Sequence, residues 1–186
     1  MPIDENGEEL DPQIIAIAQA IRQRETGGGP AVEGQTGEIK SRFQFLQGTW
    51  DTLSKRHLGD RAGEQPTDAT ENEVVYKEVK RLAEGPYSAK EKKQLKAMKQ
   101  ERFDVGNIGS IWNRGLPQFH LYSEKFDKVT GTNPNYGKGV SEDSGYEYDT
   151  GDYVDSVYVF YKRNMAKLKK DESPADALQA GLEEEE

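Results

Sequence analysis

The stretch DPQIIAIAQAIRQRETGGG (residues 11–29) predicts the first helix of the chain and the place where it ends. Asp11 is a favoured N-cap residue, and Pro12 suits the first helical position because it has no N–H to satisfy there. Apolar residues then recur at the spacing of one helix face, at Ile14, Ile17, Ala18 and Ile21. Three consecutive glycines follow from Gly27, so we expect the helix to end at about residue 25.

Glu25 stands in the last turn of this predicted helix, where a carboxylate faces the negative end of the helix dipole. That position disfavours the charged form of the carboxyl group and is therefore unhelpful for stability. It suits a general acid, which must keep its proton until a leaving group takes it. A solvated surface glutamate is the other interpretation, and the local sequence alone leaves both open.

Composition limits the classes of protein to which the chain belongs. Its 186 residues are enough for one main domain with a substantial core. Hydrophobic residues make up 33% and charged residues 32%, and part of the polar excess lies at the two ends. The formal net charge of -9 argues against a nucleic-acid-binding surface over the whole protein, so no nucleic-acid partner is expected.

Metal and cofactor chemistry is not indicated by the sequence. The absence of cysteine removes thiolate chemistry and disulfide bonds, and the two histidines, His57 and His120, lack the spacing of metal ligands. We expect neither a metal nor another cofactor. No apolar run approaches the length of a membrane-spanning helix, and the first ten residues lack the pattern of a signal peptide.

Capping patterns predict further helices and a mainly α fold with little or no sheet. Thr70 with Glu73 and Ser88 with Glu91 form two capping boxes, and Gly85 stops the first of these helices. Other helices are expected in a segment ending at Leu58, at 104–113, at 118–129 and from about Gly151 onward. Convincing alternating strands are hard to find.

The chain is expected to consist of one domain between two polar ends. We predict a flexible segment at 1–9, a compact domain at 10–165 and a charged, disordered tail at 166–186. Within the domain, residues 86–103 are interpreted as a basic helical insertion. Six basic residues there stand against two acidic ones, Glu91 and Glu101; the basic residues are Lys90, Lys92, Lys93, Lys96, Lys99 and Arg102. A solvated helix face and a contact for an anionic polymer are the two interpretations of this run.

Four segments occur in the order and approximate spacing of the motifs of a known family. They are ETGGG (25–29), GEIKSRFQFLQGTW (37–50), IWNRG (111–115) and YDTGDYV (148–154). On these motifs the sequence resembles lytic transglycosylases of the lysozyme-like superfamily, in particular the phage- and mobile-element-associated type. Glu25 and Thr26 match the first motif, with threonine in place of the usual serine, and Phe43 with Gln44 matches the second.

The later motifs supply the remaining candidate residues. Trp112 and Asn113 match the family's aromatic-Asn pair, and Tyr153 matches the tyrosine that opens the last helix. Glu38 belongs to a Gly-Glu pair that recurs in the phage-like variant. The resemblance implies that Thr26, Phe43, Gln44, Trp112, Asn113, Tyr153 and Glu38 contact substrate.

The resemblance also implies a fold and a reaction. The fold would be a lysozyme-like helical domain over 10–165, and the substrate would be the β-1,4 bond between N-acetylmuramic acid and N-acetylglucosamine in peptidoglycan. Glu25 would protonate the glycosidic oxygen and then act as base while the sugar's 6-hydroxyl closes a 1,6-anhydro ring. This is a substrate-assisted reaction, in which no second carboxylate is obligatory.

Two alternatives stay open at the level of the sequence. One is a hydrolase on the same bond, similar to goose-type lysozyme. The other is a catalytically silent structural protein of a virion or secretion machine, which would have other proteins of that assembly as partners. Because no signal peptide is recognised, we expect a phage virion, or delivery to the periplasm or cell wall by a route other than Sec.

Overall fold

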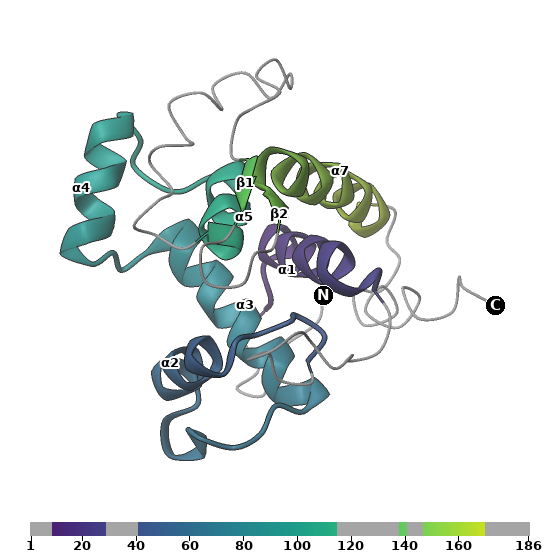
Figure 1. Ribbon diagram of the computed structural model, residues 1–186, viewed down its shortest axis with the longest axis vertical. Helices are drawn as coiled ribbons and strands as arrows, with labels where there is room; N and C mark the ends of the chain where they lie inside the picture. Colours follow the sequence, from purple (N-terminus) through teal and green to yellow (C-terminus); the bar gives the residue numbers. More distant parts are fainter. Residues whose placement is uncertain (1–8, 29–40, 115–137, 141–146, 170–186) are drawn as a thin grey trace. The chain divides into compact units, whose positions relative to one another are not determined.

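The computed structural model describes residues 9–28, 41–114, 138–140 and 147–169 (Figure 1). The helix expected at 118–129, Glu38, and most of the two terminal segments lie outside the described residues. Within the described part the chain is mainly helical, which confirms the predicted class. It divides into two compact units. The first unit comprises Met1–Lys80 with Phe160–Glu186, and the second comprises Arg81–Val159.

Figure 1 labels the helices and strands in the order in which they follow one another along the chain. The helices are α1 (Pro12–Thr26), α2 (Gln47–His57), the short 3-10 helix η1 (Gly59–Arg61), α3 (Asp68–Glu84), α4 (Ala89–Met98), α5 (Val105–Arg114) and α7 (Thr150–Leu168). Strands β1 (Lys138–Val140) and β2 (Glu147–Asp149) pair antiparallel, with Gly139 opposite Tyr148. α7 extends three residues into the segment predicted as a tail.

The first unit is built around α1, which starts and ends as predicted. The Asp11 carboxylate accepts a hydrogen bond from the Gln13 N–H at 2.7 Å, and Gly27 ends the helix in the left-handed conformation. Two side chains fasten α1 to other helices. The Tyr76 hydroxyl on α3 accepts from the Asp11 N–H at 2.9 Å, and Asn164 on α7 donates to the Ala16 carbonyl at 3.2 Å. The isoleucine face of α1 is buried in the core.

The start of α3 differs from the prediction. The capping box predicted at Thr70 and Glu73 is wrong, because Thr67 is the N-cap and α3 begins one turn earlier. The Thr67 N–H donates to Thr70 Oγ1 at 2.9 Å, while the Thr70 N–H donates to Thr67 Oγ1 at 3.3 Å. Glu73 instead pairs with Arg61 and with Lys77, both at 2.6 Å. Threonine can fill the second position of a capping box, which the Ser/Thr-x-x-Glu pattern overlooks.

The second unit contains the predicted basic helix. The Ser88 and Glu91 capping box at the start of α4 is confirmed, with both reciprocal hydrogen bonds present. Arg81, at the end of α3, forms an ion pair with Glu91 at 2.8 Å, so the same carboxylate also holds α4 against α3. Tyr87 precedes α4 in the sequence and Phe103 follows it. Their rings pack edge to face, with the ring centroids 5.5 Å apart.

Helix α5 and the part of α7 up to Val159 also belong to the second unit. Asp104 and Asn107 exchange hydrogen bonds between side chain and backbone and so cap α5. A β-carbon on Gly109 would lie 3.6 Å from Val157, which shows how closely α5 approaches the first half of α7. Asp149 caps α7 by accepting from the Asp152 N–H at 3.0 Å.

Candidate functional site

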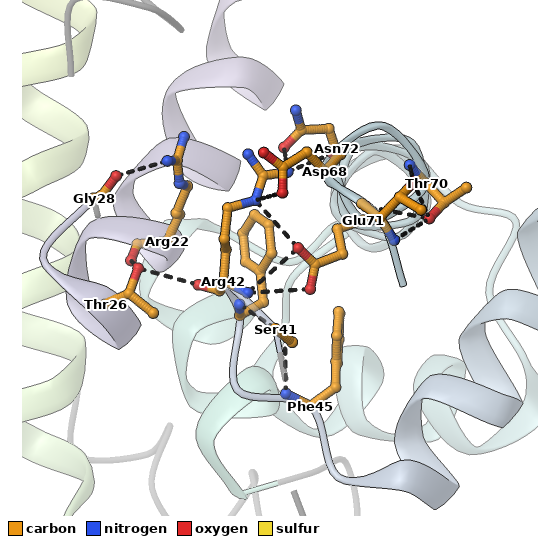
Figure 2. Close-up of polar contacts among 12 residues, drawn as sticks. Arg22, Thr26, Gly28, Ser41, Arg42, Phe45, Asp68, Thr70, Glu71 and Asn72 are labelled. Atoms are coloured by element: carbon orange, nitrogen blue, oxygen red, sulfur yellow. Dashed lines mark hydrogen bonds and ion pairs between the residues drawn. The ribbon is translucent and has the colours of Figure 1, made fainter. Parts of the chain in front are cut away.

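Glu25 occupies the last turn of α1, as predicted, and is half-buried. The chain leaves the helix through Gly27 and Gly28, with φ values of 68° and 89° that glycine adopts without steric cost. Arg22, one turn before Glu25, reaches over this exit and donates to the Gly28 carbonyl at 2.6 Å (Figure 2). Burial, with repulsion from Arg42, lowers the pKa of Arg22, although Asp68 and Glu71 act in the opposite direction. The hydrogen bond from Arg22 and the left-handed glycines together fix the end of α1.

A tight turn at residues 41–45 is hydrogen-bonded to the end of α1. The Gln44 side-chain amide donates to the Glu25 carbonyl at 2.5 Å, and the Thr26 hydroxyl lies 3.3 Å from the Arg42 carbonyl. The Ser41 hydroxyl accepts from the Phe43 and Phe45 N–H groups and closes the turn (Figure 2). The structure thus brings two segments of the resemblance together, although the residues between them are not described.

Gln44 adopts an unusual backbone conformation within this turn. Its φ of 48° lies in the left-handed region, which disfavours residues with a β-carbon. Strained non-glycine residues of this kind gather at functional sites, where the surrounding contacts hold them in place. In this chain the hydrogen bond to Glu25 and the neighbouring buried aromatic rings supply those contacts.

Phe43 lies in the core of the first unit. It is 3% exposed, and its ring lies 6.1 Å from that of Phe45, which in turn packs against Trp50 at 5.5 Å. The aromatic cluster therefore anchors the turn, and Gln44 is the member of the predicted pair that is half-buried. By contrast Leu46, next to the turn, is 53% exposed.

A buried ion pair joins Arg42, within the turn, to Glu71 on α3, and it was not predicted from the sequence. The Arg42 guanidinium lies 3.1 Å from Glu71, and the Glu71 carboxylate also accepts from the Arg42 backbone N–H (Figure 2). Arg42 further donates to Asn72 and to the Asp68 carbonyl. Arg42 is 5% exposed and Glu71 only 1%, so the pair is desolvated. The only signal in the sequence was a charged residue at position 42, directly before Phe43.

The other candidate residues belong to the second unit. The Thr150 hydroxyl donates to the Asn113 side-chain oxygen at 2.8 Å, which joins the end of α5 to the start of α7. Trp112 is half-buried, and Tyr153 is buried in the first turns of α7. Glu25, Thr26, Phe43 and Gln44 belong to the first unit. Glu38 lies outside the described residues.

The described residues contain no group of three or more histidine, cysteine, aspartate or glutamate side chains suited to hold a metal ion. His57 lies 2.7 Å from Glu78, which also binds Arg56. In the same part of the chain no helix combines the length and apolar character needed to cross a membrane.

Comparison of the chain with family models, with curated proteins and with solved structures finds no match.

Proposed function

We propose that the protein is a lytic transglycosylase that cleaves the β-1,4 bond between N-acetylmuramic acid and N-acetylglucosamine in peptidoglycan. One observation carries the proposal. Glu25 is held half-buried in the last turn of α1, and the turn that contains Gln44 is hydrogen-bonded to its backbone. The reaction needs a carboxyl group of fixed position beside a backbone that a sugar can approach, and the exposed Gly27 lies two residues after Glu25.

In the proposed reaction Glu25 acts twice. Its carboxyl group first gives a proton to the glycosidic oxygen as the bond to the muramic acid carbon breaks. The resulting carboxylate then takes the proton of the sugar's 6-hydroxyl, and that oxygen bonds to the same carbon to close a 1,6-anhydro ring. No water is consumed and no second carboxylate is required, in contrast to glycosidases that use two.

Neutral groups around Glu25 would bind the sugar. A side-chain amide has two N–H donors and a carbonyl acceptor, so Gln44 can hold the Glu25 backbone and still bind a sugar hydroxyl or acetamide group. Thr26 and Phe43 of the first unit belong to the same proposed set. The resemblance alone adds Asn113, Trp112 and Tyr153 of the second unit, together with Glu38, as further proposed substrate-binding residues. Because Phe43 and Tyr153 are buried, their contribution to binding is to position the residues beside them.

The test is mass spectrometry of the muropeptides that the protein releases from purified peptidoglycan. Anhydro-muramyl ends are the expected product. Glu25→Gln keeps the shape of the side chain and removes the proton, so release should fall by about 10²- to 10⁴-fold while the circular dichroism spectrum is unchanged. Glu84→Gln is the matched control, because Glu84 also ends a helix and is exposed, and its activity should equal that of the wild type.

Other outcomes would replace the proposal. Reducing muramyl ends would identify a hydrolase on the same bond. Wild-type activity in Glu25→Gln would exclude Glu25 as the acid, and no release by the wild type would favour a structural protein that only docks on the wall.

A further inference from the structure

Helix α4 carries a face of exposed lysines. Its inward face is formed by Glu91 and Leu95, both buried. With 3.6 residues per turn, Lys92, Lys93 and Lys96 lie on the opposite side of the helix, and all three are exposed. Lys90 and Lys99 are also exposed, one near each end of the helix. We call these five residues the α4 lysine face.

The positive charge of this face is not neutralised within the described part of the chain. None of the five lysines forms an ion pair with a described carboxylate. Glu91, the acidic residue on the helix itself, is turned inward and is bound by Arg81 and by the Ser88 cap. A solvated face on a stabilising surface helix normally alternates charge signs, and this one does not.

We propose that the α4 lysine face binds a flexible polyanion with phosphate groups along a non-aromatic chain, namely a polyol-phosphate polymer of the cell wall. Lysine ammonium groups are point charges on flexible stems, and they suit a ligand recognised by charge density rather than by a fixed fork geometry. The choice of a wall polymer as the source of the phosphates rests on the proposed function, whereas the charge of the face does not.

The same surface is poorly suited to nucleic acid. Single-stranded nucleic acids are held by aromatic side chains on which bases stack. No aromatic residue lies between 88 and 102, and the flanking Tyr87 and Phe103 pack against each other.

A lipid membrane is also poorly suited as a ligand of the α4 lysine face. Helices that lie in a membrane interface insert large apolar side chains. The described residues expose two such side chains, Leu46 and Val159, and neither belongs to α4. Between the lysines the outward positions are Ala89 and Ala97.

The test measures binding of fluorescently labelled poly(glycerol phosphate) to the full chain over a series of salt concentrations. Lys92→Gln with Lys96→Gln removes two charges from the centre of the face. Lys55→Gln with Lys169→Gln removes the same charge from exposed positions elsewhere. The first variant should bind about tenfold more weakly at low salt and with a shallower salt dependence, because fewer counterions are released. The control should bind like the wild type. Circular dichroism checks that α4 stays folded in both.

Several results would overturn the inference. Equal losses in the two variants would mean that net charge, not α4, governs binding. If the wild type does not bind poly(glycerol phosphate) at low salt, the α4 lysine face is not a binding site for this polymer. Tighter binding of duplex DNA or of anionic vesicles would assign the face to a different class of ligand. Because binding needs no turnover, an inactive wild type in the muropeptide assay would refute the proposed function without altering this result.

Discussion

At the scale of single residues, the features that define the candidate site are contacts between positions far apart in sequence. Gln44 binds the backbone of Glu25 across 19 positions, and Arg42 binds Glu71 across 29. Both pairs lie in the first unit and use the same turn. The turn is thereby fixed from two sides, which is the condition for holding a strained residue such as Gln44.

The strain at Gln44 leads to a prediction about stability. Gln44→Ala loses the hydrogen bond to Glu25 and keeps a β-carbon at φ 48°, so we expect a loss of about 1 kcal/mol in unfolding free energy. Gln44→Gly loses the same bond but relieves about 1 kcal/mol of steric cost, and it should be close to the wild type. Urea denaturation of the three proteins measures the difference. An alanine variant as stable as the glycine variant would show that the left-handed conformation carries no cost here.

At the scale of elements, caps decide where helices begin. The predicted ends of α1 and the capping box of α4 were confirmed, because each depends on residues within a few positions of one another. The start of α3 was misplaced because two overlapping patterns compete there, and the earlier one adds a turn. The extra turn carries Asp68, which pairs with Arg42 beside the buried Glu71. The helix start therefore places one of the groups that bind Arg42.

The position of the α3 cap can be tested by mutation. Thr67→Ala removes the acceptor for the Thr70 N–H, and we expect it to reduce the unfolding free energy by about 1 kcal/mol. The exposed Thr49→Ala serves as a control for the loss of a threonine hydroxyl and should change stability by less than about 0.5 kcal/mol. A Thr67→Ala variant as stable as this control would place the helix start elsewhere.

At the scale of the whole molecule, an acidic chain carries a basic helix and depends on ion pairs within its core and at its surface. Burial alone would raise the pKa values of Glu73 and Glu91, but hydrogen bonds and charge attraction outweigh it. Lys77 and Arg61 hold the pKa of Glu73 below its usual range, and Arg81 with Ser88 does the same for Glu91. Both carboxylates therefore stabilise the folded state when they are ionised.

Acid should consequently destabilise the protein. A group whose pKa is lowered on folding contributes stability above its ordinary value of 4.5, and that contribution is lost as the pH falls through the folded pKa. We expect the unfolding free energy to decrease on acidification below about pH 4.5, and Glu91→Gln to flatten part of that decrease.

Urea denaturation across the acid range tests this dependence. Glu101→Gln, at an exposed position close by, should leave the slope unchanged. A Glu91→Gln variant that keeps the full wild-type slope would show that this carboxylate does not govern the acid response.

Features that depend on neighbouring residues could be predicted from the sequence alone. The helical class, the extent of α1, the cap of α4 and the place of Glu25 in a last helical turn follow from periodicity and from capping chemistry over a few positions. The concentration of lysines on α4 was also readable, because helical spacing places them.

Contacts between side chains far apart in sequence could not be predicted and are seen in the folded chain. The hydrogen bond from Gln44 to Glu25, the burial of Arg42 against Glu71 and the contact of Thr150 with Asn113 depend on the path of the backbone between helices. Polar groups removed from water must find partners, and for each of these residues the sequence offers many partners of the right chemistry. The choice among them is made by packing, which no local pattern encodes.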